Sequence, residues 1–293
     1  MRIGLATSSN VPEWEVDDRP LHRALEEAGA EVSHPVWNDP GVDWAGFDGV
    51  LIRTTWDYHL QRDAFVSWAE RVGATTLLLN SASVVRWNTH KSYLRRLEAA
   101  GLATVETLWL PAGGSVDLRR ECESRGWSRA FIKPQVGATA RGTLRFDVSE
   151  SGLAEAHAHV ASLLPEEGLM VQPYIESVET HGELSAIFVD GEHTHGVRKI
   201  PLAGDYRVQD DHGASDEPYT FSEEELTPFR EFLASSPDDL LYVRFDLLRH
   251  PDGSLRLIEL EGVEPSLFFR HSEEAARSLA VALLARVSAA NRA

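Results

Sequence analysis

The chain contains a single cysteine, Cys122, among its 293 residues. One cysteine excludes an intrachain disulfide and a zinc site built from cysteine pairs, and it is consistent with the cytoplasm. No apolar run approaches the length of a membrane span, and the first residues lack the long apolar core of a signal peptide. We therefore expect a cytoplasmic protein that does not cross a membrane.

Basic residues are also scarce, because 28 lysines and arginines face 46 aspartates and glutamates, for a formal charge of −18. This excess argues against a nucleic acid or an anionic membrane as the main partner. It leaves room for an anionic small molecule held in a locally basic cleft. The twelve histidines show no metal-ligand spacing. The length and the 43% hydrophobic content permit one large domain or two to three small ones.

The first hundred residues alternate between strand and helix patterns, which predicts βαβ crossovers and a parallel sheet. No G-x-G-x-x-G follows the first strand, so a dinucleotide site there is not expected. Arg53, Trp56 and Asp57 follow a buried strand at the edge where such sheets bind ligands. They form either a substrate site or a capping turn with a buried tryptophan. Expected strands cover residues 2–6, 31–37, 49–53 and 75–79, and expected helices cover residues 20–28 and 63–72. Within the stretch 83–101 we expect a helix that is led by Asn88, His90 and Lys91 and ends at Gly101.

The middle of the chain places Lys133 within an apolar strand over residues 130–134. A lysine there is rarely buried without a partner, and a phosphate is one such partner. A loop of small residues follows, but it lacks the P-loop pattern and the helix that a P-loop precedes. It predicts either a flap that closes over phosphates or a plain hairpin turn. Its residues are Gly137, Ala138, Thr139, Ala140, Arg141 and Gly142.

Residues 169–175 form an apolar, extended segment whose backbone suits a flat heterocycle, although a plain core strand is an equal alternative. Residues 182–191 and 195–200 predict another hairpin. Residues 202–221 are long, polar and without regular pattern, and such loops inside compact chains are usually functional or disordered. This loop carries Arg207 and His212. Further helices are expected at residues 117–125, 152–164 and 272–290.

The segment from 242 to 261 contains two apolar runs around a His-Pro-Asp-Gly turn, and it predicts a β-hairpin. Alternation places Asp246 on one strand face and Glu259 with Glu261 on one face of the partner. The two sets share a face if the connecting loop has an even number of residues. Like-charged pairs at about 4 Å then cost roughly 4 kcal/mol each. Such a cluster of oxygen ligands predicts a Mg²⁺ site, whereas the alternative is a solvated charged face.

The motifs together, in this order, strongly resemble those of the ATP-grasp ligases, over essentially the whole chain. No single motif is specific, but their shared order and spacing is. The motifs are Lys91, Phe-Ile-Lys-Pro around Lys133, the Gly-rich hairpin, Val-Gln-Pro-Tyr-Ile at 171–175, Gly-Glu-Leu-Ser at 182–185, Arg-Lys-Ile-Pro at 198–201, Arg-Phe-Asp at 244–246 and Glu-Leu-Glu at 259–261.

The resemblance implies roles for individual residues. The ATP ligands it implies are Lys91, Lys133, the flap residues 137–142, Gln172, Pro173, Tyr174, Ile175 and Glu183. The implied Mg²⁺ ligands are Asp246, Glu259 and Glu261, although the family more often has asparagine at the last position. The implied catalytic cations are Arg244, Arg198 and Lys199. Adding the candidates above, the expected substrate residues are Arg53, Trp56, Asp57, Arg207, His212 and Ser266.

The resemblance also implies an α/β fold in three parts. These are an N-terminal parallel α/β domain (1–87), a central subdomain with the flap (88–171) and a C-terminal antiparallel subdomain with the metal site (172–293). Segments 56–58, 86–88 and 259–267 further resemble the subgroup that contains the O-ureido-serine cyclo-ligase of D-cycloserine biosynthesis.

The expected activity is ATP-dependent joining of a carboxylate to an amine through an acylphosphate, with MgATP as cofactor. One or two Mg²⁺ ions are expected, with Mn²⁺ as a substitute. The alternatives are an intramolecular cyclo-ligase acting on a small amino-acid derivative and a catalytically silent nucleotide-binding protein. The expected partners are small-molecule acids and amines, with no nucleic acid and no membrane, and the oligomeric state stays open.

Overall fold

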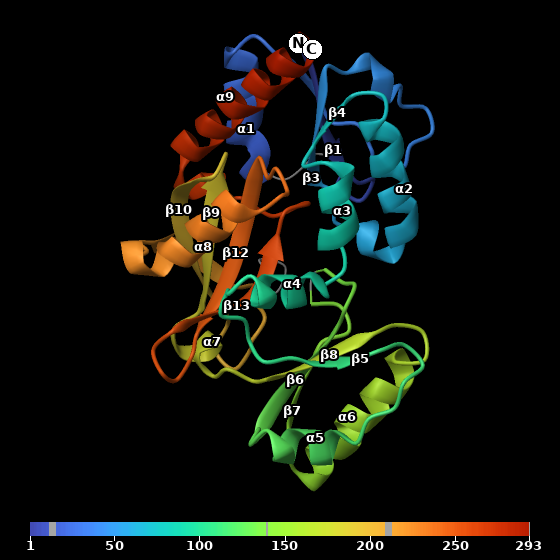
Figure 1. The fold of residues 1–293 in the computed structure, drawn as a ribbon, viewed down its shortest axis with the longest axis vertical. Helices are drawn as coiled ribbons and strands as arrows, with labels where there is room; N and C mark the ends of the chain where they lie inside the picture. The colour runs from blue at the N-terminus through green and yellow to red at the C-terminus, as the bar shows by residue number, and fades with distance from the viewer. Residues whose placement is uncertain (12–15, 139, 209–212, 293) are drawn as a thin grey trace.

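A computed structural model describes residues 1–11, 16–138, 140–208 and 213–292. Three sheets follow one another along the long axis of the molecule (Figure 1). The N-terminal sheet is parallel and has the order β2-β1-β3-β4, as the alternating pattern predicts. Its strands are β1 (Arg2–Thr7), β2 (Glu31–Ser33), β3 (Gly49–Thr54) and β4 (Leu77–Leu79).

Helices cover both faces of this parallel sheet. The long C-terminal helix packs against the first helix, and the two chain ends therefore lie beside each other (Figure 1). A shared core links these helices to residues of both the N-terminal and the C-terminal sheet. The helices are α1 (Arg19–Glu27), α2 (Arg62–Gly73) and α9 (Glu273–Ala290), and the short 3-10 turns are η1 (Val16–Asp18), η2 (Trp44–Gly46), η3 (Tyr58–Leu60) and η5 (Phe269–His271).

The C-terminal sheet is antiparallel throughout and has the order β11-β10-β9-β12-β13. One of its faces packs against α8, where Phe229 lies 4.7 Å from Phe245 between ring centres. The opposite face contributes Tyr242 to the core under α9. The elements are α7 (Ser177–Thr180), β9 (Glu183–Val189), β10 (Glu192–Ile200), β11 (Ser215–Tyr219), α8 (Glu223–Ser235), β12 (Tyr242–Arg249) and β13 (Leu255–Glu261).

The remaining sheet, at the lower end of Figure 1, is also antiparallel, with the order β5-β8-β6-β7. Two helices pack on it and close a separate core around Ile132 and Val171. The segment between β6 and β7 is a hairpin connection, as predicted for the flap. The elements are β5 (Leu108–Leu110), α5 (Leu118–Ser124), β6 (Arg129–Pro134), β7 (Leu144–Asp147), α6 (Glu150–Leu163) and β8 (Leu169–Pro173).

The helix expected after Asn88, His90 and Lys91 is α4 (Tyr93–Ala99), and a separate helix, α3 (Ala82–Asn88), precedes it. Between the two, the Lys91 amide donates to Gln135 O at 2.7 Å. One sequence-based expectation about an element is wrong. The polar loop over residues 202–221 contains the strand β11, which pairs with β10. β11 is an edge strand, and its charges and Pro218 are what edge strands tolerate, so no apolar alternation marks it. Within the described residues, no helix is long and apolar enough to span a membrane.

Candidate active site

The hairpin β12–β13 has a register that the length of its loop would not produce. The last paired residues are Arg249 and Leu255, so the loop contains five residues, and this odd number alone would place Ile258 opposite Asp246. A β-bulge between the two ends of the ladder shifts the register by one, so that Asp246 faces Glu259 and Arg244 faces Glu261. The expected convergence of acids therefore occurs through the bulge and not through an even loop.

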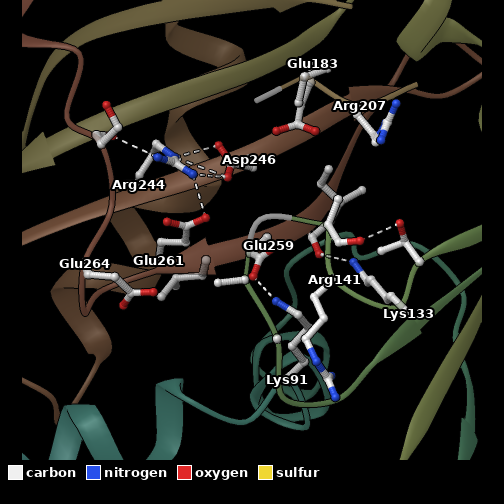
Figure 2. Close-up of a pocket in the computed structure, with 18 of the residues that line it drawn as sticks. Lys91, Lys133, Arg141, Glu183, Arg207, Arg244, Asp246, Glu259, Glu261 and Glu264 are labelled. Atoms are coloured by element: carbon white, nitrogen blue, oxygen red, sulfur yellow. Dashed lines mark hydrogen bonds and ion pairs between the residues drawn. The ribbon is translucent and has the colours of Figure 1, made fainter. Parts of the chain in front are cut away.

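Four neighbouring strands, β10, β9, β12 and β13, contribute charged side chains to this same face of the sheet. Figure 2 shows those from β9, β12 and β13. Arg244 is the centre of the group: its Nε and Nη2 donate to Asp246 at 2.9 and 2.8 Å, and Nη2 also donates to Glu261 at 2.6 Å. Ser185 on β9 donates to Asp246 at 2.5 Å. Burial alone raises the pKa of Asp246, but Arg244 and Lys199 outweigh this effect and hold the pKa well below its usual range.

Only three lysines occur in the sequence, at 91, 133 and 199, and all three line one cavity. Lys199 pairs with Glu183 and lies 3.2 Å from Asp246. Lys91, from the turn between α3 and α4, pairs with Glu259. Surface cations elsewhere in the chain are arginines, so lysine is confined to the position where a compact point charge is needed. This confinement is a signal in the sequence that motif order alone does not use.

Lys133 differs from the other two lysines. It projects from β6 toward the hairpin, and the one acceptor it reaches among the described residues is Ile258 O, at 3.4 Å (Figure 2). No described carboxylate lies within ion-pair distance of its ammonium, although the residue is only 9% exposed. Burial lowers the pKa of Lys133 to about 8, with Glu259 opposing and Lys91 adding to the shift. The site thus holds a buried cation that an anionic ligand would complete.

Negative charge is in excess on the hairpin side of the cavity. Burial raises the pKa of Glu261 to about 7, with Asp246 and Glu259 adding to the effect of burial and Arg244 opposing it. Burial and the nearby Glu261 raise the pKa of Glu264 to about 8. The raised pKa values mean that ionisation of Glu261 and Glu264 is unfavourable in this environment. A bound cation would favour their ionised forms.

The cavity has a volume of about 310 Å³ and lies between the hairpin, β6, the flap and the turn after β3. This size is at the lower end for small-molecule sites. Its predicted residues are Trp56, Lys91, Lys133, Gly137, Ala138, Ala140, Arg141, Glu183, Lys199, Arg207, Arg244, Asp246, Glu259, Glu261 and Ser266. Further lining residues that were not predicted include Tyr58, Thr89, Tyr206, Val208, Glu264 and Phe268.

The expectation that Arg53 and Asp57 line the substrate pocket is wrong. Arg53 is 2% exposed and donates through Nη2 to Asp18 at 2.7 Å and to Pro265 O at 3.0 Å, outside the cavity lining. Asp57 accepts from Trp37 Nε1 at 2.7 Å. Both side chains are used for packing the N-terminal sheet, so only Trp56 of this predicted trio faces the cavity.

Arg198 also lies outside the cavity lining, because alternation along β10 turns it away from the face that presents Lys199. Its guanidinium pairs with Glu217 on β11 at 2.5 Å. The structure therefore gives no support to a catalytic role for Arg198. Gly142 and the segment 172–175 likewise lie outside the lining, and Gln172 donates to Thr107 Oγ1 at 2.9 Å. Two predicted residues, Thr139 and His212, lie outside the described residues.

A Mg²⁺ ion was expected on the three hairpin acids. Among the described residues, no three histidine, cysteine, aspartate or glutamate side chains form a ready-made metal cage. The carboxylates instead bind Arg244, Lys91 and Lys199. Their chemistry still fits a hard divalent cation, since all three offer oxygen donors, two share Arg244 Nη2, and the site has excess negative charge.

The sequence and the structure of the chain are both similar to those of known proteins. Residues 3–80 match the model of the N-terminal domain of D-cycloserine synthetase DcsG. The chain is 33% identical to the cycloserine biosynthesis protein DcsG of Streptomyces lavendulae, over 97% of this chain and 98% of that protein. A crystal structure of D-cycloserine synthetase DcsG superposes with a TM-score of 0.88 at 28% identity, covering 98% of this chain and 100% of that one.

A more distant solved structure shares the fold. The D-alanine–D-alanine ligase from Bacillus anthracis, complexed with ATP, has a TM-score of 0.72 at 15% identity and covers 100% of this chain and 99% of that one. The fold predicted from the order of motifs, an α/β arrangement with a parallel N-terminal sheet, a small central α+β part and a C-terminal antiparallel sheet, is confirmed.

Proposed function

Because the chain belongs to the DcsG family of ATP-grasp ligases, which form carbon–nitrogen bonds with ATP, we propose that the cavity holds MgATP and a small carboxylic acid. The substrate carboxylate attacks the terminal phosphate of ATP, so that ADP leaves and an acylphosphate forms. An amine then attacks the acyl carbon, displaces inorganic phosphate and loses a proton. We propose the division 1–87, 88–171 and 172–293 for the three parts, with the cavity among them.

The observation that carries the proposal is Lys133. A buried ammonium whose one described acceptor is a carbonyl at 3.4 Å needs an anionic partner, and a phosphate group supplies one. Lys91 lines the same cavity and is paired with Glu259. The flap with Arg141 borders the same cavity. Together these residues place positive charge on one side of the cavity, facing the hairpin carboxylates on the other. This arrangement suits a nucleotide phosphate bridged to a metal ion.

Mg²⁺ would be held by Asp246, Glu259 and Glu261, and it would neutralise phosphate charge as the reaction proceeds. We propose one or two ions, with Mn²⁺ as a substitute. The chain's own contribution is positioning and electrostatics. Arg244, fixed by Asp246 and by Ser266 O at 2.8 Å, presents a preorganised cation to the negative charge that develops on the reacting carbonyl. Lys199 neutralises Glu183 and Asp246 beside it.

The adenine ring would lie beyond the phosphate end of the cavity, toward residues 172–175. An apolar cluster there contains Ile175, Val208 and Leu248, with Tyr206 packed against it. Tyr206 and Val208 also border the cavity, so the cluster continues from its wall. The relatives that carry ATP, or ADP with Mg, share this fold, which supports nucleotide binding here.

A second candidate is the intramolecular reaction, in which the acid and the amine belong to one molecule. It is favoured by the 33% identity to a protein named for cycloserine biosynthesis, and by a small cavity. In both cases we propose small-molecule substrates and no nucleic acid or membrane partner.

The test is ADP release from MgATP across a panel of carboxylates, each with and without an amine. Calorimetry with MgATP on the native protein and on Lys133→Ala locates the phosphate site, with Arg230→Ala on α8 as the control for loss of a cation outside the cavity. We expect the Lys133 variant to lose MgATP affinity at an unchanged melting temperature. Unchanged affinity in a folded Lys133→Ala protein would refute the assignment of the phosphate site.

A further inference from the structure

Phe268, in the turn that follows β13, has a left-handed backbone conformation, with φ 51° and ψ 41°. Three residues other than glycine have a positive φ in the described part of the chain, and the other two, Ala140 and Asp190, lie in hairpin connections. A bulky side chain in this conformation is an outlier, because its Cβ crowds the following carbonyl oxygen. Such strain persists only where the surrounding structure holds it, and it concentrates at functional sites.

A buried aspartate holds the strained turn. Asp17 is 1% exposed, and it accepts hydrogen bonds from both sides of Phe268: from Ser266 Oγ at 3.0 Å and from the Arg270 amide at 3.2 Å. The Arg270 guanidinium also donates to it through Nη1, at 3.3 Å. Because Asp17 is 249 residues away from Ser266 in the sequence, the tertiary fold maintains the conformation of the turn.

This conformation places an aromatic ring against two guanidinium groups at the cavity wall. Phe268 is 4% exposed and lines the cavity, and the guanidinium carbons of Arg244 and Arg270 lie over its ring, 5.5 and 4.9 Å from the ring centre. A ring face attracts a cation, most strongly where water is excluded. Arg53 makes the same contact with Tyr242, but Tyr242 belongs to the regular strand β12 and does not line the cavity.

The ring differs in chemical kind from the other partners of Arg244. Nε and Nη2 donate to Asp246 and Glu261, the carboxylates proposed to hold Mg²⁺, and Nη1 donates to Ser266 O. A divalent cation on these carboxylates competes with the guanidinium for the same oxygens. It does not compete for the face of the ring. The contact with Phe268 therefore holds Arg244 whether or not the carboxylates bind a metal ion.

We propose that Phe268 is a positioning residue for Arg244, and that its ring holds the guanidinium in the orientation required at the reacting carbonyl. This inference rests on the proposed function, because Arg244 is the cation assigned to that reaction. Arg244 acts on negative charge that develops as the reaction proceeds. Loss of the ring therefore slows turnover and leaves the binding of substrates nearly unchanged.

The experiment measures kcat and KM for ADP release by Phe268→Leu, with an acid and an amine to which the native protein responds. Leucine keeps apolar bulk but has no aromatic face. We expect kcat to fall by about tenfold, KM to change by less than about twofold, and MgATP affinity in calorimetry to stay the same. Phe268→Tyr and Phe268→Trp keep an aromatic face and should retain most of the turnover.

Two further measurements separate positioning from packing. Phe269→Leu is the matched control, because Phe269 is the next residue and is fully buried in the core under α9 but does not line the cavity. It should lower the melting temperature and leave kcat unchanged. In an Arg244→Gln background, Phe268→Leu should cause no further loss of kcat, because the cation that the ring positions is absent.

Equal losses of kcat in Phe268→Leu and Phe269→Leu would show a packing role and overturn the inference. A further loss in the Arg244→Gln background would do the same, as would losses in both aromatic variants as large as the loss in Phe268→Leu. Native kcat in Phe268→Leu overturns the inference and leaves the proposed function standing. A native protein that forms no ADP with any acid refutes the proposed function, and the inference with it.

Discussion

Two buried arginines, Arg53 and Arg244, have nearly the same local geometry. Each binds an aspartate through Nε and Nη2, with Nη2 at 2.7 Å from Asp18 and 2.8 Å from Asp246. Each donates to a carbonyl of the turn at 265–266, at 3.0 and 2.8 Å. Each also lies over an aromatic ring, 5.4 Å from Tyr242 and 5.5 Å from Phe268.

The difference between the two arginines lies in what surrounds each pair. Arg53 and Asp18 are 2% and 3% exposed, and neither lines the cavity. Arg244 binds a second acid, Glu261, and faces a cavity in which acids and lysines from four further strands meet. A buried ion pair with no cavity beside it is part of the fold, whereas one set among unbalanced charges over a cavity belongs to a binding site.

The largest expected effect concerns the ion pair of Arg53 and Asp18. Arg53→Ala leaves Asp18 buried without its cation, and breaking such a pair costs about 3–5 kcal/mol of unfolding free energy. Chemical denaturation measures this loss. The double variant Asp18→Leu with Arg53→Met should recover most of it, because no uncompensated charge is left. A single variant as stable as the native protein would mean that the two arginines do not differ in the way we describe.

The cavity cluster should respond mainly through activity. Glu259→Gln keeps the shape of the side chain but removes one of the hairpin carboxylates, so we expect ADP formation to fall by about 10²–10³-fold. Without metal, its melting temperature should fall, because, against the effect of burial, Lys91 and Lys133 hold the pKa of Glu259 below its usual value, and Lys91 loses its ion-pair partner. Glu217→Gln in the same sheet serves as the control. Native turnover in the Glu259 variant would show that these acids are only a charged surface.

A smaller effect is expected from pH. Burial lowers the pKa of Lys133 from its usual 10.5 to about 8 in the free protein, and a bound phosphate favours the charged form. Proton uptake on binding then makes MgATP affinity fall as pH rises through 8, by about tenfold between pH 7 and 9. Calorimetry at both values measures this change. Lys133→Arg keeps the cation and should flatten the profile, and an unaltered profile would place the titrating group elsewhere.

The smallest effect is expected at Arg198. Since its guanidinium pairs with a partly exposed glutamate outside the cavity, Arg198→Ala should change ADP formation by less than about twofold and stability by less than about 1 kcal/mol. Steady-state kinetics and thermal unfolding check both values. A large loss of turnover with unchanged stability would restore Arg198 to the catalytic group and contradict its position in the structure.

Motif order alone was enough to predict the fold class and most of the cavity. Lys133, Arg244 and the three hairpin acids were singled out from residue type and spacing, whereas Lys91, Glu183 and Lys199 were assigned through the family resemblance, and all of them line one cavity. The first group was accessible to prediction because each of its residues sits in a short apolar strand, where a charged side chain is conspicuous. Arg53 met the same criterion and was misassigned, since sequence spacing does not reveal that Asp18, 35 residues away, neutralises it.

Glu264 shows the opposite limit. In sequence it is one more glutamate in an acidic chain, and nothing in its spacing distinguishes it from its neighbours. The backbone around it accepts five hydrogen bonds from side chains at positions 53, 56, 80, 242 and 244, which meet only when the chain is folded. Whether a buried charge has a partner decides if it is structural or functional, and this depends on which side chains the tertiary structure places beside it.

The sequence by itself determined which chemical groups this protein can bring together, because the alternation of strands and the positions of charged residues within them are local features. The tertiary structure decided how those groups are oriented. An odd loop would have turned Glu259 and Glu261 away from Asp246, and one extra residue in the ladder turns them back. A bulge depends on packing between strands on both sides. Because side chains alternate between the two faces of a strand, the bulge decides which face every acid of the hairpin occupies.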